Sequence, residues 1–336
     1  MIDAFLHVCR FLGLFAWARR TTRHRLRILC YHGIWMGPAP HFGDRVFMDP
    51  ALFAHRMNAL KRAGYTALPL AEAWQRCQEG RLNGREIVIT IDDGWAGTAL
   101  HMAPVLARLG WPSTLYLSTH DFSFGAPIPP VTATWLLERA TQPLDPRTLL
   151  GQETAPDDWA TALEERIRAL PEGLAQEAEW TRWGAALGVD VPAVLACRSL
   201  HPMTPAELRQ CLDTGMDVQL HTHHHDLGDM RAIVIERELA LNREHLASLT
   251  GRPPAAFQHL CYPSGVHDKR AFATLRQSGI QTATTTDYGL PSGRHEPMAL
   301  PRILDGQSMS DIALEARLSG FWYWVDRLRG RVTGGA

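Results

Sequence analysis

The chain has 336 residues, of which 46% are hydrophobic and 21% are charged, and its formal net charge is -1. This is ordinary globular composition with enough length for a large core, and the balanced charge argues against nucleic acid as a partner. None of the six cysteines forms a CxxC pair, which argues against a zinc–thiolate site. The cysteines are expected to be reduced and buried, which favours the cytoplasm without excluding export.

Residues 1–24 are predicted to form an amphipathic helix. Its apolar residues recur at helical spacing, namely Phe5, Val8, Leu12, Phe15 and Ala16. Five arginines follow, namely Arg19, Arg20, Arg23, Arg25 and Arg27. The stretch is too short to span a bilayer and makes a weak signal peptide. Two interpretations stay open: residues 1–27 contact an anionic membrane surface, or the helix packs on the protein itself.

Short apolar runs alternate with helical patterns along the rest of the chain. The predicted strands are Leu26–Tyr31, Tyr65–Leu68, Ile87–Ile91, Ser113–Leu117, Met216–Leu220, Phe257–Tyr262, Gln281–Thr285 and Ala299–Ile303. The predicted helices between them include Ala51–Ala63, Thr98–Leu109, Ala206–Asp213 and Ile233–Leu249. This α/β alternation predicts a parallel sheet with crossover helices. About eight strands favour a closed or nearly closed barrel, with a doubly wound open sheet as the alternative.

One region interrupts the alternation. Residues 121–203 carry a proline-containing loop and then helical stretches, which predicts a helical insertion into a barrel of residues 25–320. The stretches are Thr134–Ala140, Asp157–Leu170 and Ala175–Leu187. The insertion is expected either to cover the site as a lid or to pack at the periphery. Residues 321–336 are expected to form a C-terminal tail.

Polar residues cluster where the predicted strands end, which is where α/β barrels carry their reactive groups. Asp92 and Asp93 follow one apolar run, and two adjacent carboxylates repel each other unless a cation such as a divalent metal offsets them. The alternative is an acidic turn that caps the next helix.

A run of histidines, broken only by Thr222, follows another predicted strand, and imidazole and carboxylate are zinc ligands. His221 and His225 are separated by one helical turn, whereas His221 and His223 would share a face if the strand continued. The spacing alone leaves both pairs open, and for any single histidine a solvated loop position is the alternative.

The motifs together resemble the polysaccharide deacetylases, the NodB-like group of carbohydrate esterase family four. Thr90–Gly94 is similar to the first motif of that family, and His221–His225 to its H-[ST]-x-x-H motif. Further similarities are Tyr31–Ile34, Tyr262–Gly265 and Leu300–Ile303. The resemblance spans roughly residues 26–320 and implies a distorted (β/α)7 barrel with a helical insertion.

The resemblance also implies roles for individual residues. Asp93, His221 and His225 would hold a divalent metal, with zinc the expected ion, and Asp92 would be the general base. The backbone N–H of Ser264 would be an oxyanion donor, and Tyr262 would lie beside it in the substrate site. Thr222 would order the histidine loop.

Two positions depart from the family pattern. Cys261 stands where the third motif often begins with an arginine that supports the catalytic aspartate, and we hypothesise that Arg302 takes over that role. The late L-x-H motif, which supplies a general-acid histidine, has no match near residues 300–320. His32 is the first choice as its replacement because it follows a predicted strand, and His224 and His295 are alternatives.

The sequence therefore predicts a metal-dependent hydrolase that removes N-acetyl or other N-acyl groups from a sugar in a cell-envelope polysaccharide or its precursor. The alternatives are a metal-dependent hydrolase of another ester or phosphodiester, and a degenerate sugar-binding protein. The expected location is the cytoplasm or the cytoplasmic membrane surface.

Overall fold

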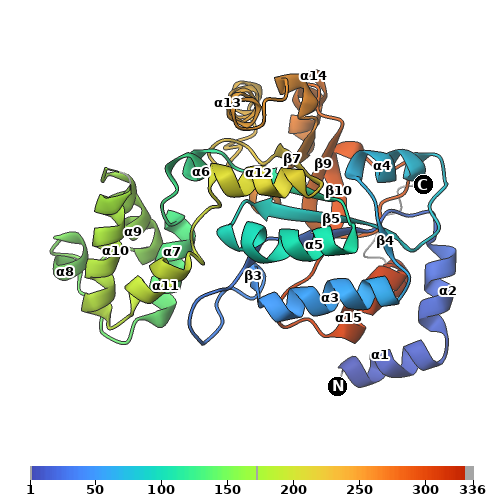
Figure 1. Cartoon of the computed structure of the whole chain (residues 1–336), viewed down its shortest axis with the longest axis horizontal. Coiled ribbons are helices and arrows are strands. Elements are labelled where there is room, and N and C mark those ends of the chain that lie inside the picture. The colour runs from blue at the N-terminus through green and yellow to red at the C-terminus, as the bar shows by residue number, and fades with distance from the viewer. Residues whose placement is uncertain (1, 172, 330–336) are drawn as a thin grey trace.

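Seven parallel strands close into a barrel in the computed structural model, which describes residues 2–171 and 173–329 (Figure 1). In spatial order they are β1 (Ile28–Tyr31), β10 (Leu300–Leu304), β9 (Thr282–Tyr288), β8 (His259–Cys261), β7 (Met216–Leu220), β6 (Ser113–Leu117) and β5 (Glu86–Asp93). The pairing of β5 with β1 closes the barrel, with Ile28 opposite Val88 and Tyr31 opposite Ile91. The closed barrel is confirmed, and the open sheet is excluded.

Three short strands lie outside this closed ring. The strand β4 (Thr66–Ala67) pairs with the first residues of β5, and β2 (Gly33–Ile34) and β3 (Phe47–Met48) form a separate parallel pair. All eight predicted strands are present, with ends that differ by a few residues; β2 and β3 are additional.

Both faces of the barrel strands are buried, as expected of parallel strands covered by helices. Successive side chains along a strand belong to two different hydrophobic cores. Ile89 and Ile91 belong to the large core shared with the surrounding helices, whereas Val88 and Tyr116 belong to a second core inside the barrel. The six cysteines are free, as expected, and all except the half-buried Cys197 are buried.

Helices cover the barrel between the strands. They are α3 (Pro50–Arg62), α4 (Leu70–Gln78), α5 (Ala103–Leu109), α12 (Pro205–Asp213), α13 (Ala232–Thr250), α14 (Phe272–Gln277) and α15 (Asp311–Ser319). The predicted helix at residues 98–109 begins as a π-helical turn, η1 (Thr98–Met102). The helix predicted at Ala206–Asp213 is α12, which begins one residue earlier at Pro205, where Thr204 and Glu207 form a capping box.

The insertion forms a helical lobe at one end of the molecule (Figure 1). Its helices are α6 (His120–Phe124), α7 (Pro129–Arg139), α8 (Pro146–Leu150), α9 (Trp159–Arg168), α10 (Leu174–Leu187) and α11 (Val191–Cys197). Trp180 and Trp183 belong to a separate hydrophobic core in this lobe, which also includes Phe47 of β3 and Trp95 after β5. This shared core fixes the lobe against the barrel.

The N-terminal helices pack against the C-terminal helix at the other end of the long axis (Figure 1). The N-terminal residues form two helices, α1 (Ile2–Phe11) and α2 (Leu14–Thr21), because Gly13 adopts a left-handed conformation that ends the first. The expectation of one helix is therefore corrected. The described part of the expected tail includes α16 (Phe321–Leu328), whose Phe321 packs with Leu6 and Phe15.

One face of the N-terminal helices thus packs on the protein itself. Their other face exposes apolar side chains, namely Ile2, Phe5, Val8, Phe11, Leu12, Leu14 and Trp17. Within the described residues, no helix is long and apolar enough to cross a membrane.

Candidate active site

The two aspartates reach the same rim because the backbone turns sharply at the end of β5. In a regular strand, Asp92 and Asp93 would point to opposite faces. Asp93 instead has φ +75°, and Gly94 follows with φ +89°. A Cβ atom at Gly94 would clash with Leu117 Cδ1, so the turn requires glycine. Both carboxylates consequently line one cavity.

Asp93 meets the two outer histidines of the run. Its Oδ1 lies 3.1 Å from His221 Nε2 and 3.4 Å from His225 Nε2. Two ligand atoms on one tetrahedral zinc ion are separated by roughly 3.3 Å when each metal–ligand bond is about 2.0–2.1 Å. The three side chains therefore fit a shared divalent ion, and the spacing selects His225 over His223 as the partner of His221.

The surrounding contacts orient these ligands. The Nδ1–H of His221 donates to the Cys261 carbonyl at 2.8 Å, which leaves Nε2 as the atom that can bind a metal. Thr222 is buried with φ +64°, and its Oγ1 accepts from the Asp226 N–H. Thr222 thus holds the loop and does not line the cavity. Trp95, which sequence reasoning missed, donates from Nε1 to Asp93 Oδ2 at 2.9 Å.

The charges around Asp93 and His221 shift the pKa values of both side chains toward their charged forms. Burial would raise the pKa of Asp93, but hydrogen bonds from His221 and His225 hold this pKa well below its usual range. Burial would lower the pKa of His221, but Asp93 and Asp92 outweigh this effect and raise it. A metal ion at this position would take the place of the shared protons.

Asp92 is held by a buried arginine from β10. Arg302 Nη1 and Nη2 donate to Asp92 Oδ1 and Oδ2 at 2.8 and 2.7 Å. Burial by itself raises the pKa of Asp92, but the charge and hydrogen bonds of Arg302 lower it to about 2. Cys261 Sγ lies 3.3 Å from Asp92 Oδ2 and 3.1 Å from Arg302 Nη2. Arg302 thus supports Asp92 from β10, and Cys261 adjoins both groups.

The histidines considered as general acids lie in different places. His32 Nε2 is 3.7 Å from Asp92 Oδ2, and both His32 and His224 line the cavity. His295 instead contacts the Ala299 carbonyl and is not among the residues lining the cavity. The geometry therefore favours His32, which adjoins the carboxylate of Asp92.

The cavity has a volume of about 720 Å³ and continues from the aspartates to the helical lobe. Ser264, with φ +54°, and Tyr262 line it on the barrel side. The Tyr262 hydroxyl donates to the Met298 carbonyl, so its hydroxyl is engaged away from the cavity. The lobe contributes Ile128, Pro130, Val131, Glu164 and Arg168. The insertion therefore forms one wall of the site. The sequence patterns had left open whether it covers the site or packs at the periphery.

Two comparisons with known proteins find similar chains. A family model described as polysaccharide deacetylase matches residues 179–283, a segment that contains the histidine loop and Tyr262–Gly265. The deacetylase PplD of Streptococcus pyogenes, solved in complex with acetate, superimposes with a TM-score of 0.59 at 17% identity, over 88% of this chain and 98% of that one. The barrel is of the polysaccharide deacetylase type.

Other solved structures share the deacetylase-type barrel. IcaB from Ammonifex degensii has a TM-score of 0.54 at 14% identity, and the match covers 88% of this chain and 96% of that one. A polysaccharide deacetylase from Bacillus cereus has a TM-score of 0.53 at 18% identity, with 88% and 69% covered. At such identities the likeness establishes the fold. A comparison with curated proteins finds no match.

Proposed function

We propose that the protein is a metal-dependent deacetylase that removes N-acyl groups, acetyl first among them, from sugars of a polysaccharide or its precursor. One observation carries this proposal: Asp93, His221 and His225 converge beside the ionised Asp92 in the cavity of a deacetylase-type barrel. The matching family model and the names of the similar structures support it.

The metal ligands would be Asp93, His221 and His225, and zinc suits two imidazoles and one carboxylate. When bound, a divalent ion of this kind supplies Lewis acidity, which polarises a carbonyl group and lowers the pKa of water. Chain residues would do the rest of the chemistry.

Asp92 is proposed to accept the proton of the attacking water. With a pKa of about 2 it is ionised at neutral pH, and the two hydrogen bonds from Arg302 fix its orientation. The Ser264 backbone N–H is proposed to donate to the developing oxyanion, and one such donor contributes about 3 kcal/mol. His32 would deliver a proton to the leaving amine, because it lines the cavity 3.7 Å from Asp92.

The charge of the cavity disfavours a phosphodiester substrate. The described residues that line the cavity include one arginine, Arg168, and no lysine. Arg168 already pairs with Asp121 at 3.1 Å and with Glu164 at 2.9 Å. A phosphate-binding site would present unpaired cations. A neutral N-acyl sugar agrees better with this lining.

An acetate-release assay on N-acetylglucosamine oligomers tests the proposed function. We expect acetate and free amine in equal amounts, loss of activity with a chelator, and recovery with added zinc. Sugar binding without any acetate release in the zinc-loaded protein would instead identify a degenerate binder.

We further propose that the N-terminal helices bind an anionic membrane surface. The exposed apolar side chains of α1 and α2 lie next to exposed Arg20 and Arg23, a combination that suits an interfacial helix on acidic lipids. The helical lobe lies at the opposite end of the molecule, so the cavity beside it would be held away from the bilayer (Figure 1).

A further inference from the structure

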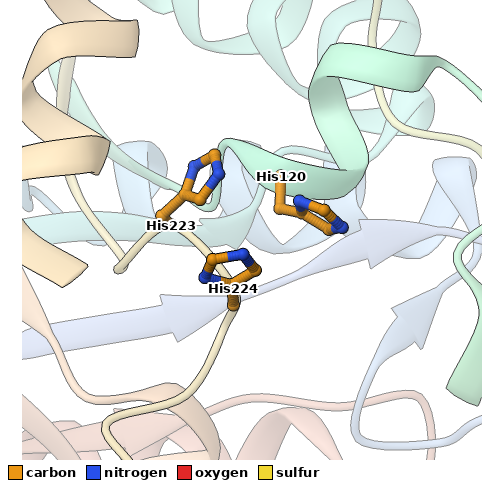
Figure 2. Close-up of side chains that lie close together, drawn as sticks. All are labelled: His120, His223 and His224. Carbon is orange, nitrogen blue, oxygen red and sulfur yellow. The ribbon is translucent and has the colours of Figure 1, made fainter. Parts of the chain in front are cut away.

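A second group of imidazoles lies in the wall of the cavity. His120 begins α6, and His223 and His224 come from the loop after β7 (Figure 2). The ring centroids are 4.4 Å apart for His223 and His224, 4.7 Å for His120 and His224, and 5.4 Å for His120 and His223. One ring nitrogen of each residue lies within 4.8 Å of the others.

The backbone holds the two segments in this arrangement. The His120 N–H donates to the His223 carbonyl at 2.9 Å, which ties the start of α6 to the histidine loop. Glu238 on α13 accepts the backbone N–H groups of His223 and His224 at 3.0 and 2.9 Å. The group is therefore built by three elements, and is not a flexible surface run.

Contacts at Nδ1 orient two of the rings. Glu238 Oε1 lies 2.7 Å from His224 Nδ1, which makes Nδ1 the donor and leaves the lone pair on Nε2. Thr119 Oγ1 lies 2.9 Å from His223 Nδ1, so the Nε2 atom of the His223 ring faces away from Thr119. A carboxylate behind a histidine is the usual support of a metal-binding imidazole.

Two other groups of potential ligands offer no comparable site. In the described part of the chain, the remaining groups besides that of Asp93 both contain Asp92. The Asp92 carboxylate is already neutralised by Arg302, so a divalent ion there would lie beside a buried guanidinium and break a buried ion pair.

We propose that His120, His223 and His224 bind a second divalent transition-metal ion, separate from the one expected at Asp93, His221 and His225. Three imidazoles favour Zn²⁺, Ni²⁺ or Cu²⁺ over the oxygen-seeking Mg²⁺ and Ca²⁺. His120 and His224 line the same cavity as Asp93 and His225, so the second ion lies in the wall that faces the substrate.

Metal counting on the full chain tests the proposal. The protein is stripped with a chelator and dialysed against Zn²⁺, and Co²⁺ absorption spectra report each binding event. We expect two equivalents in the wild type and one in the double variant His120→Ala, His224→Ala. His225→Ala should also retain one equivalent, but with the spectrum of the other site. His101→Ala, on η1, is the control and should retain two.

A single equivalent in the wild type, or two in a folded double variant, would overturn the proposal. Circular dichroism of the metal-free proteins checks folding. If the double variant does not fold, the single variant His120→Gln is measured instead and should bind one equivalent. We expect it to fold because His120 is only half-buried.

A second variant tests the orientation by Glu238. Glu238→Gln retains a side-chain oxygen for the backbone N–H groups but removes the carboxylate behind His224. We expect the second binding event to weaken about 10- to 100-fold and the first to stay unchanged. Equal weakening of both events would contradict a separate site.

Discussion

At the scale of single residues, Asp92 and Asp93 are adjacent in sequence but have different surroundings. Asp93 contacts two imidazoles at the cavity, whereas Asp92 is paired with a buried guanidinium. These different surroundings support the proposed division of roles, with metal binding by Asp93 and proton transfer by Asp92.

The first prediction concerns Asp92→Asn. The variant should retain its zinc, because Asp92 is not among the three converging ligands, but acetate release should fall by about 10²- to 10⁴-fold, the usual contribution of a general base. Zinc content and acetate release are measured on the same preparation, and Asp93→Asn, expected to lose metal as well, is the comparison. Normal turnover in Asp92→Asn would show that another group is the base.

The second prediction concerns Arg302→Met. Removing the guanidinium leaves a buried carboxylate unpaired, which should lower the free energy of unfolding by about 3–5 kcal/mol and raise the pKa of Asp92. Urea denaturation measures the first effect. Arg270→Met, which removes a solvent-exposed pair with Asp268, is the control and should leave the free energy of unfolding nearly unchanged. Arg302→Met should also lower acetate release, and adding Cys261→Arg should recover part of it, because Cys261 lies beside the Asp92 carboxylate.

The third prediction concerns buried His259. Burial lowers its pKa to about 4, whereas in the unfolded chain it titrates near a pKa of about 6.5. The unfolded state therefore binds more protons between these values, so stability falls as the pH is lowered from neutral toward the folded-state pKa. The contribution of His259 between about pH 7 and pH 5 is about 2 kcal/mol.

Melting temperatures across this pH range measure the effect. His259→Gln should flatten the dependence, and His7→Gln, exposed on α1, should leave it as in the wild type. An equally steep dependence in His259→Gln would assign the acid sensitivity to other groups.

At the scale of elements, the turn after β5 controls the metal ligands. The fourth prediction is that Gly94→Ala destabilises the protein by about 2–4 kcal/mol, because it adds both left-handed strain and a clash with Leu117. Gly110→Ala is the matched control: Gly110 has φ +65° but nothing within 4 Å of an added Cβ, so it should show the strain alone, about 1 kcal/mol. Equal losses in denaturant titrations would mean that the clash is relieved by movement of Leu117.

The helical lobe is the other element that shapes the site. Its Trp180 and Trp183 belong to the lobe's own core, while Ile128 and Val131 pack against that core and line the cavity. A substrate in the cavity would therefore contact two hydrophobic units that are held together through Phe47 and Trp95.

At the scale of the whole molecule, the N-terminal helices and the helical lobe lie at opposite ends (Figure 1). The fifth prediction is that the protein co-sediments with vesicles containing phosphatidylglycerol but not with purely zwitterionic ones. Arg20→Gln with Arg23→Gln should weaken binding about 10- to 30-fold, since each basic residue contributes about 1 kcal/mol. Phe11→Ser should also weaken it, because Phe11 is 90% exposed.

The control for this surface is Leu174→Ser. Leu174 is 83% exposed but lies on the helical lobe, so its replacement should leave vesicle binding unchanged. Equal binding to both kinds of vesicle, or no effect of the arginine and Phe11 variants, would contradict a membrane-binding N-terminal face.

Local patterns in the sequence determined the strands, most helices and the expectation of a closed barrel. Runs such as Ile87–Ile91 and Ser113–Leu117 are buried on both faces, so their short stretches of β-prone residues mark them as strands. The capping box at Thr204 is equally local. The family motifs also singled out Asp93, His221 and His225, which the fold brings together.

Only the tertiary structure decided which distant groups meet. The pairing of Arg302 with Asp92 joins residues 210 positions apart, and the second histidine group joins the start of α6 to a loop after β7. The position of the lobe beside the cavity likewise depends on side chains from both units. Such contacts depend on barrel closure and on packing between elements, which local periodicity does not encode.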